Sequence, residues 1–362
     1  MTEPTVALVH DNFTGPMGMG KVVELHARWL LDEGWPLTVV GGDVPAWLIE
    51  RNATHVRLVG KPHGLPSLAE HLVWCARAAR VLRGVEADVI HVHAPLLAPL
   101  GNLLTTHFME RPAYVREVRE QSRGLEGLLR HAQANLSRWI DDIAYRRLAG
   151  RTFVSFVSEF LRDEFRLHYG NPLGGWVLPP PAPAWRPVGD EEREAARRRW
   201  DAAAGRIVVG YVGGSDPRKG FFHLEPIANS PDLQLLVAGP GSERMRLGGA
   251  AGLGFIDIDE LYAACDVVVA PAAFDSAPVA VLQAIARGVP VVTSRFSGWA
   301  SALTRLEAGV VWDGREPLEA AIRRATEIPL EACRRFTEEF SEGRQRDALL
   351  SVYRHVARLS GS

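Results

Sequence analysis

The sequence predicts an α/β protein of two consecutive domains, each a doubly wound parallel sheet covered by helices. Short β-branched runs alternate with amphipathic helical patterns along most of the chain. A segment dense in Pro and Gly and then in charge, residues 170–192, interrupts this alternation, which restarts afterwards. The length of 362 residues also exceeds what one core usually organises. We expect domains at 1–178 and 179–340, a helix at 341–362 that packs back on the first domain, and a ligand cleft between the domains.

The first half begins with a buried strand that leads into an amphipathic helix. "TVALVH" at residues 5–10 is apolar and β-branched, as strands are. The following "KVVELHARWLLDEGW" places Val22, Leu25 and Trp29 on one helical face. A second helix, "SLAEHLVWCARAARVLRG", starts at Ser67, a residue type suited to an N-cap. The other predicted strands of this half are residues 36–42, 87–94, 102–108 and 151–158.

The second half repeats the alternation and ends in a helical tail. Runs such as "RIVVGYVGG" and "CDVVVAPA" are almost continuously apolar, which is typical of parallel strands covered on both faces. The tail, residues 331–359, is predicted to be helical. The predicted strands are residues 206–214, 233–239, 252–256, 265–272 and 288–294.

Composition excludes several classes of protein. Apolar residues make up 47% of the chain, which is enough for real cores. Lys plus Arg is 41 and Asp plus Glu is 43, a net charge of −2, so no global field favours nucleic acid. The isolated Cys75, Cys265 and Cys333, an N-terminus unlike a signal peptide and the lack of a long apolar run predict a cytoplasmic protein. The oligomeric state stays open.

The stretch "FDSAPVAVLQAIARGVPVVTS" at residues 274–294 is a candidate anion site. It predicts a helix that begins near Ser276, with Asp275 just before it and Gln283 within it. The first N–H groups of such a helix and the positive end of its dipole suit a pyrophosphate. The plainer interpretation is that Asp275 is only an N-cap and Gln283 only a helix-surface residue.

Two glycine-rich loops offer backbone amides to a ligand. "GGSDPRKG" at residues 213–220 carries Lys219, whose ammonium suits a phosphate, although a solvated turn lysine is the alternative. "TGPMGMGK" places Gly15, Gly18 and Gly20 before the first helix. The glycine spacing of this loop is wrong for a dinucleotide fingerprint, and the residue after its lysine is wrong for a Walker loop.

Histidines and acids near strand ends could bind a metal, but we expect none here. His107 follows a predicted strand, in "TTHF". His91 and His93 share one face of another strand, yet no third ligand is evident. Asp257-Ile-Asp259 spells a metal-binding Asp-x-Asp, but Asp259 before "ELYAACD" is better interpreted as a helix cap.

The order of these features resembles a GT-B glycosyltransferase, and most closely the retaining enzymes of glycosyltransferase family 4. The resemblance implies two Rossmann-like domains and transfer of a hexosyl group from a nucleotide-diphosphate sugar to the hydroxyl of a small-molecule or glycan acceptor. It also implies retention of configuration, with no metal and no cofactor. The similar stretches are "NFTGPMGMGKVVELHARWLLDEGW", "DVIHVHAP", "TTHF", "FVSFVSEFLRDEF", "YVGGSDPRKG", "LLVAGPG", "DELYAACDVVVAPA" and residues 274–294.

The resemblance assigns roles to individual residues. Asp275 aligns with an acid that lies near the donor sugar, Gln283 with one that binds the ribose, and Lys219 with the phosphate-binding lysine. His107 aligns with a histidine that contacts the donor sugar. The other expected donor-site residues are Gly214, Arg218, Ser276, Ala277, Pro278 and Val279, and the acceptor or sugar loop is Gly15, Gly18 and Gly20.

Three departures from the family pattern leave alternatives open. Gly214 stands in place of an arginine, Asp275 in place of a glutamate and Gln283 in place of a second glutamate. A fourth departure, separate from these three, is Ala277-Pro278 in place of the usual Phe-Gly. A degenerate family member that binds a ligand or partner without turnover is therefore the second hypothesis, and a sugar-nucleotide epimerase is the third.

The arginine-rich segment at residues 110–130 also has two interpretations. It could bind an anionic acceptor or a membrane lipid at the surface. We favour a solvated helix whose arginines pair with neighbouring glutamates.

Overall fold

The computed structural model describes the chain in nine stretches and divides it into two compact units. The first unit consists of Met1–Arg111, Leu129–Pro180 and Gly343–Ser362, and the second is built chiefly from Pro181–Glu342. The described stretches are residues 3–14, 18–52, 55–62, 67–109, 124–148, 152–202, 205–214, 217–245 and 247–360.

The first unit is built on a parallel sheet of order β3-β2-β1-β4-β5-β6-β7. The segment 170–192, predicted as a linker, contains the edge strand β7 and the start of a helix. This strand was not predicted because it contains Gly174 and Gly175, both with positive φ. Glycine weakens the interior of a strand, so a propensity argument does not assign one here. The strands are β1 (Val6–Asn12), β2 (Leu37–Asp43), β3 (Val56–Leu58), β4 (Val89–Val92), β5 (Leu103–Thr106), β6 (Phe153–Phe156) and β7 (Leu173–Val177).

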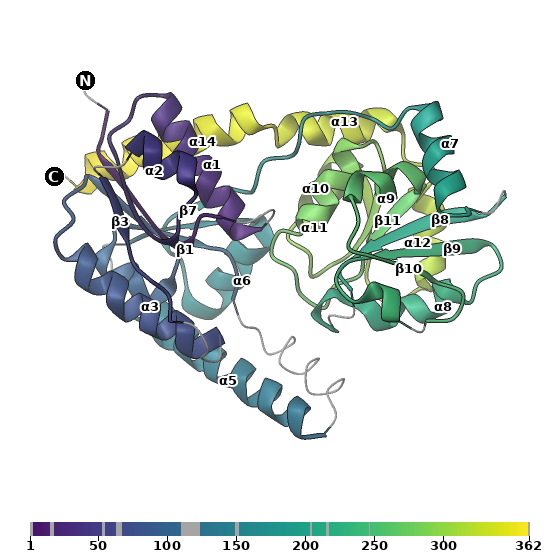
Figure 1. Ribbon diagram of the computed structural model, residues 1–362, viewed down its shortest axis with the longest axis horizontal. Helices are drawn as coiled ribbons and strands as arrows, with labels where there is room; N and C mark the ends of the chain where they lie inside the picture. Colours follow the sequence, from purple (N-terminus) through teal and green to yellow (C-terminus); the bar gives the residue numbers. More distant parts are fainter. Residues whose placement is uncertain are drawn as a thin grey trace. The chain divides into compact units, whose positions relative to one another are not determined.

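Helices cover both faces of this sheet (Figure 1). On one face Trp29 of the first helix and Tyr353 of the last pack with Leu8 and Leu37 in one apolar cluster. The C-terminal helix is therefore part of the core of the first unit. The helices of this unit are α1 (Met19–Asp32), α2 (Ala46–Asn52), α3 (Ser67–Leu82), η2 (Pro95–Leu100), α5 (Gly124–Arg146), α6 (Glu159–Tyr169) and α14 (Glu342–Ser360).

The second unit repeats the design with the strand order β10-β9-β8-β11-β12-β13, again parallel. All five strands predicted for this half form, and β13 is added at one edge. The strands are β8 (Ile207–Val212), β9 (Leu233–Ala238), β10 (Ala251–Gly254), β11 (Val267–Ala270), β12 (Val291–Ser294) and β13 (Gly309–Trp312).

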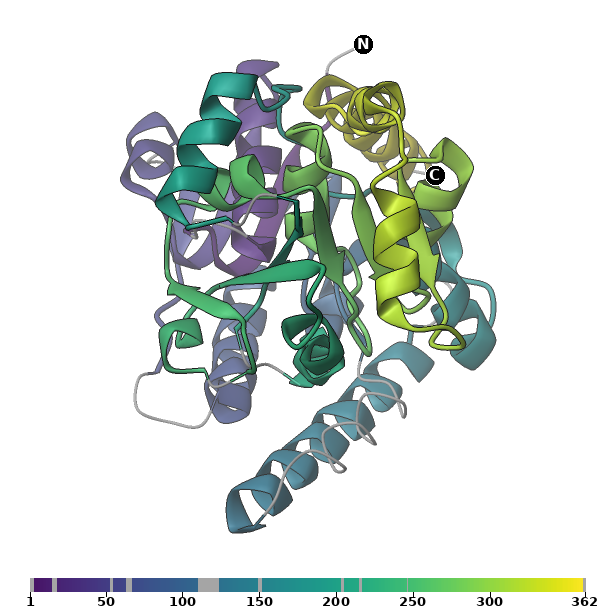
Figure 2. The same ribbon diagram turned by 90° about the vertical axis from the view of Figure 1, so that its right-hand side faces the viewer.

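Helices cover both faces of this second sheet (Figure 2), and an apolar cluster attaches them to each face. One cluster joins α7, α9, α10, α11 and α13 to the sheet, and the other joins η4, α8 and α12 to it. The helices are α7 (Asp190–Arg199), η3 (Pro217–Lys219), η4 (Phe221–Leu224), α8 (Glu225–Ala228), η5 (Ser242–Arg244), α9 (Ile258–Ala264), α10 (Val279–Ala286), α11 (Ala300–Leu306), α12 (Leu318–Ala325) and α13 (Leu330–Glu339).

The predicted helical tail is two helices rather than one. α13 ends at Glu339 and α14 begins at Glu342. The two residues between these helices pair with Ala182 instead of continuing a helix. The N–H of Ala182 donates to the carbonyl of Phe340 at 2.7 Å, and Ser341 forms a β-bridge with Ala182. Among the described residues, no helix has the length and apolar character that crossing a bilayer requires.

Candidate functional site

The topology of the second sheet brings two predicted motifs together. β8 and β11 are neighbours in the sheet although the strands β9 and β10 lie between them in the chain, so the strand order reverses at this pair. Ligands of open α/β sheets bind outside the carboxyl ends of strands at such a point. The Gly213–Gly220 loop follows β8, and Asp275 follows β11.

Lys219 and Asp275 form an ion pair at this place. The Lys219 Nζ atom lies 3.4 Å from Oδ2 of Asp275. Asp275 is buried, and its backbone is fixed by the N–H of Gly298, which donates to its carbonyl at 2.8 Å. The N–H of Ala273 donates to the carbonyl of Arg218 at 2.9 Å. These bonds tie the loop after β8 to the segment after β11.

Gly214 and Gly220 allow the close approach of these backbones. Both have positive φ, 59° and 75°. A Cβ at Gly220 would lie 2.0 Å from the carbonyl oxygen of Pro271, and one at Gly214 would lie 2.8 Å from that of Pro240. The arginine that the family pattern has at position 214 does not fit this loop without a backbone shift, which gives the departure a physical reason.

The helix expected to begin near Ser276 begins at Val279, so that prediction is wrong by about one turn. Pro278 is the N-cap, with ψ at 114°. A proline disfavours the helical conformation of the residue before it, so Ala277 cannot easily join the helix. Trp299 supports the cap, because its Nε1–H donates to the carbonyl of Pro278 at 3.1 Å. Ser276 and Ala277 therefore belong to the preceding loop.

Gln283 has a defined partner on the neighbouring helix. The hydroxyl of Tyr262 lies 3.3 Å from its Oε1 atom and 3.2 Å from the carbonyl of Ala280, and it donates to these oxygens. Burial raises the pKa of Tyr262, so this phenol stays a neutral donor. The amide oxygen of Gln283 is thus oriented toward α9.

The Asp-x-Asp sequence forms a helix start. The carboxylate of Asp257 accepts from the N–H of Asp259 at 3.1 Å and caps α9, so the cap is Asp257 and the predicted cap at Asp259 is wrong. Asp259 lies in the first turn, where its Oδ2 pairs with Arg186 at 2.8 Å.

His107 of the first unit is held by a second histidine. It follows β5 directly, beside β4. Nδ1 of His93 and Nε2 of His107 are 2.7 Å apart, a hydrogen bond between two imidazoles. Burial, together with neighbouring histidines, holds the pKa of both rings well below the ordinary value. His107 is therefore a neutral hydrogen-bonding group rather than a cation.

A third imidazole, which the sequence did not indicate, lies beside His91 and His93. His26 of α1 offers a nitrogen within 4.8 Å of nitrogens of the other two. Burial lowers the pKa of His26 to about 3. His91, however, uses both nitrogens in hydrogen bonds, at 2.8 Å to the Tyr353 hydroxyl and 2.6 Å to that of Thr105. Its side chain thus joins α14 to the sheet.

Part of the predicted N-terminal loop lies outside the described residues, namely Gly15. Gly18 is the N-cap of α1, with φ at 86°. A Cβ at Gly20 would lie 2.8 Å from the carbonyl oxygen of Asn12, so α1 starts tightly against the end of β1. Residues 110–123, most of the arginine-rich segment, also lie outside the described residues.

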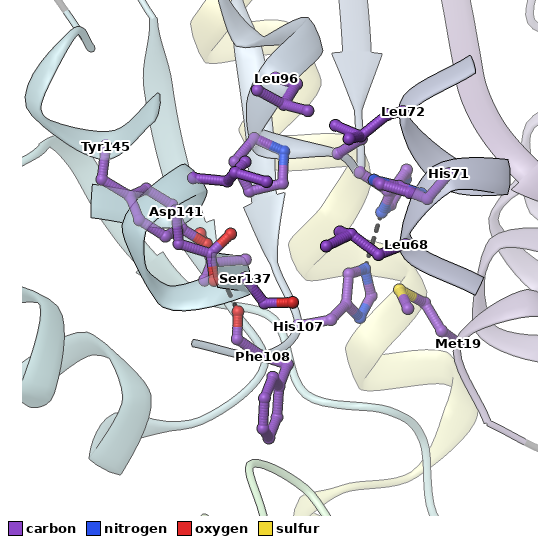
Figure 3. A pocket seen from close by; sticks show the side chains of 15 residues that line it. Met19, Leu68, His71, Leu72, Leu96, His107, Phe108, Ser137, Asp141 and Tyr145 are labelled. Atoms are coloured by element: carbon purple, nitrogen blue, oxygen red, sulfur yellow. Dashed lines mark hydrogen bonds between the residues drawn. The ribbon is translucent and has the colours of Figure 1, made fainter. Parts of the chain in front are cut away.

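A cavity of about 240 Å³ opens beside His107 (Figure 3). Its walls come from α1, α3, η2, α5 and the ends of β4 and β5. His71, Asp141 and Tyr145 line it, and no sequence motif pointed to them. The carboxylate of Asp11, 3.9 Å from Nδ1 of His71, and the Sγ atom of Cys75, 3.5 Å from its Nε2, raise the pKa of His71 to about 10, so its ring is charged at neutral pH. Such long-range pairing leaves no local sequence signal.

Comparisons with known sequences connect both halves of the chain to one family. Residues 16–180 match the model of Glycosyltransferase Family 4, and residues 189–327 match that of Glycosyl transferases group 1. A GDP-mannose-dependent alpha-mannosyltransferase of Mycobacterium tuberculosis is 27% identical over 248 residues, 65% of this chain and 62% of the relative. A D-inositol 3-phosphate glycosyltransferase of Acidothermus cellulolyticus is 31% identical over 296 residues, 68% of this chain and 62% of the relative. The chain thus spans about three fifths of the length of these relatives.

Solved structures share the fold over nearly the whole chain. A sucrose-phosphate synthase of Thermosynechococcus elongatus has a TM-score of 0.72 at 17% identity, covering 99% of this chain and 100% of that one. Anabaena Alr3699/HepE in complex with UDP-glucose has a TM-score of 0.68 at 16% identity, covering 97% and 99%. The likeness to these structures and the two parallel-sheet units show the GT-B fold, and the two family matches show that the chain belongs to the glycosyltransferases of the family 4 type.

Proposed function

We propose that this protein transfers a hexosyl group from a nucleotide-diphosphate sugar to an acceptor hydroxyl, with retention of configuration and without a metal. In the reaction, the bond between the sugar C1 and the diphosphate oxygen breaks, and a bond from C1 to the acceptor oxygen forms. The electron pair and the acceptor proton both end on the departing diphosphate. The observation that carries the proposal is the Lys219–Asp275 pair at the carboxyl ends of β8 and β11.

On the donor side, positively charged groups are assigned to the diphosphate and the carboxylate is assigned to the sugar. Lys219 supplies a preorganised cation for the diphosphate, whose negative charge grows as the bond breaks. The first N–H groups of α10 add a partial positive charge near Asp275. The carboxylate of Asp275 repels phosphate, so we assign it to the sugar hydroxyls, which can donate to it. Relatives that are named as GDP-mannose-dependent support the donor class.

On the sugar side His107 acts as a neutral hydrogen-bonding group. Its low pKa suits a contact with a sugar hydroxyl, because no charge then has to be desolvated. His93 fixes the tautomer and the ring orientation through the bond to Nε2.

A second candidate function is binding without turnover. Gly214 leaves the loop after β8 without the usual arginine, and the oxygen of Gln283 already accepts from Tyr262. A site weakened in both respects could hold a nucleotide and fail to stabilise its departure.

One experiment separates the candidates. The purified protein is incubated with a library of nucleotide-diphosphate sugars, and mass spectrometry follows each donor with EDTA present. Transfer predicts slow loss of one sugar as free hexose and release of its nucleoside diphosphate. Thermal stabilisation by a donor that stays intact would favour binding alone. A donor whose sugar changes without release of nucleotide would favour epimerisation. If no donor stabilises the protein and none releases its nucleotide, the proposal is contradicted.

A further inference from the structure

The cavity beside His107 is apolar on one side and polar on the other. Leu68 and Leu72 of α3 and Leu96 of η2 form the apolar side, and the charged ring of His71, also on α3, lies at its edge, where it pairs with Asp11. Figure 3 shows these three leucines together, across the cavity from Ser137 and Asp141 of α5. The neutral ring of His107 lies at the wall between them. A ligand that fills this space therefore meets hydrocarbon over one part of its surface and hydrogen-bonding groups over another.

The chemistry of the walls selects among possible acceptors. A polyol that entered would exchange its bonds to water for contacts with leucine, and each unpaired hydroxyl would carry a desolvation cost. An apolar ring loses nothing by leaving water and gains from burial. An apolar cavity of about 150 Å³ already admits benzene in another protein, so about 240 Å³ admits a substituted ring.

We propose that this cavity receives the apolar body of the acceptor, a hydroxylated aromatic or alicyclic ring, and that the acceptor hydroxyl lies at the polar side formed by His107, Ser137 and Asp141. The inference rests on the proposed glycosyl transfer and names the acceptor class for it. The D-inositol 3-phosphate of the named relatives is a polyol, so this acceptor differs in kind from theirs.

Two acceptor probes of opposite character test the class. With the donor that releases its nucleoside diphosphate, the protein is given 2-naphthol or myo-inositol, and the glycosylated product is measured by mass spectrometry. We expect kcat/KM for 2-naphthol to exceed that for myo-inositol by about tenfold or more. Equal or reversed preference would overturn the inference while leaving glycosyl transfer intact.

Variants of Leu72 locate the effect in the cavity. Leu72→Gln places an amide among the leucines and is expected to raise KM for 2-naphthol about tenfold. Leu72→Met keeps an apolar side chain of similar volume and is expected to leave KM nearly unchanged. Leu167→Gln, at a position on α6 that is 73% exposed, is the matched control for the substitution itself. Equal KM values in Leu72→Gln and Leu167→Gln would overturn the inference.

A binding measurement separates the failure of this inference from failure of the proposed function. Saturation-transfer NMR with 2-naphthol and no donor, compared between the protein and Leu72→Gln, reports on the cavity without the donor site, whereas release of nucleoside diphosphate into water reports on the donor site alone. Nucleotide release without 2-naphthol binding would contradict only the proposed acceptor class and would leave the proposed transfer reaction standing. Naphthol binding by a protein that releases no nucleotide from any donor sinks the transfer reaction and, with it, the acceptor role of the cavity.

Discussion

At the scale of single residues, Lys219 offers the sharpest test of the donor site. Its ammonium pairs with Asp275 at 3.4 Å and is partly exposed, so an arriving diphosphate can compete for it. We expect Lys219→Ala to weaken binding of UDP or GDP by about tenfold or more, because hydrogen bonds to charged groups contribute about 1.5–3 kcal/mol. Isothermal titration calorimetry measures the dissociation constant directly.

The control for this variant is Asp257→Ala. The Asp257 carboxylate caps α9, so its loss is expected to cost about 1 kcal/mol of stability and to change nucleotide affinity less than Lys219→Ala does. Equal or reversed effects on affinity would contradict the assignment of Lys219 to the phosphates.

His93 gives a second test at this scale, as a positioning residue that acts through His107. Replacing it by Phe removes the 2.7 Å bond that orients the His107 ring. We expect kcat to fall by about a hundredfold, the order of loss for a small misplacement of a reacting group, with KM for the donor nearly unchanged. His93→Gln retains a hydrogen-bonding side chain and should recover part of the rate. A purely structural role would lower the melting temperature of both variants without this difference in kcat.

At the scale of elements, Gly220 tests whether the contact between the loop after β8 and the segment after β11 is needed. Gly220 and Gly314 both have φ near +80°, at 75° and 81°. A Cβ at Gly314 meets no atom within 4 Å, whereas one at Gly220 would lie 2.0 Å from the carbonyl of Pro271. We expect Gly314→Ala to cost about 1 kcal/mol and Gly220→Ala about 3 kcal/mol. Urea unfolding of both variants measures the difference, and equal costs would show that the loop relaxes freely.

The sequence predicted elements where one physical signal dominates. Apolar, β-branched runs identify β1, β8 and β11, because strands covered on both faces must be continuously apolar. The sequence-based prediction failed where two signals compete. Pro278 makes α10 begin later than the apolar pattern suggests, and the glycines of β7 give that strand a low strand propensity.

The candidate site divides in the same way. Lys219 and Asp275 could be found because each sits in a local motif, and the sheet topology then brought them together. His26, His71 and Asp141 were missed because their positions depend on tertiary packing, which leaves no local pattern.

At the scale of the whole molecule, buried histidines are distributed unevenly between the two units. His10, His26, His91, His93 and His107 belong to the first unit, and burial lowers the pKa of each. His223 is the sole histidine of the sequence between Pro181 and Glu342, and burial lowers its pKa too. The first unit therefore carries most of the histidines that resist protonation when folded.

This imbalance predicts that acid destabilises the first unit before the second. Below about pH 6.5 the unfolded chain binds protons at these histidines and the folded chain does not, so stability falls as pH falls, by up to about 1.4 kcal/mol per pH unit for each such group. The contribution of His71 to stability has the opposite sign, because folding raises its pKa to about 10. This contribution is fully present below pH 6.5 and is lost only as pH rises toward 10. His71 therefore does not offset the loss of stability between pH 6.5 and 5.

Hydrogen exchange, corrected for its intrinsic pH dependence, measures this difference between the units. At pH 5 the protection of backbone amides should fall more in β1 and β4 than in β8 and β11. A uniform loss of protection across both sheets would contradict the imbalance, because it would mean that the buried imidazoles are not what limits stability in acid.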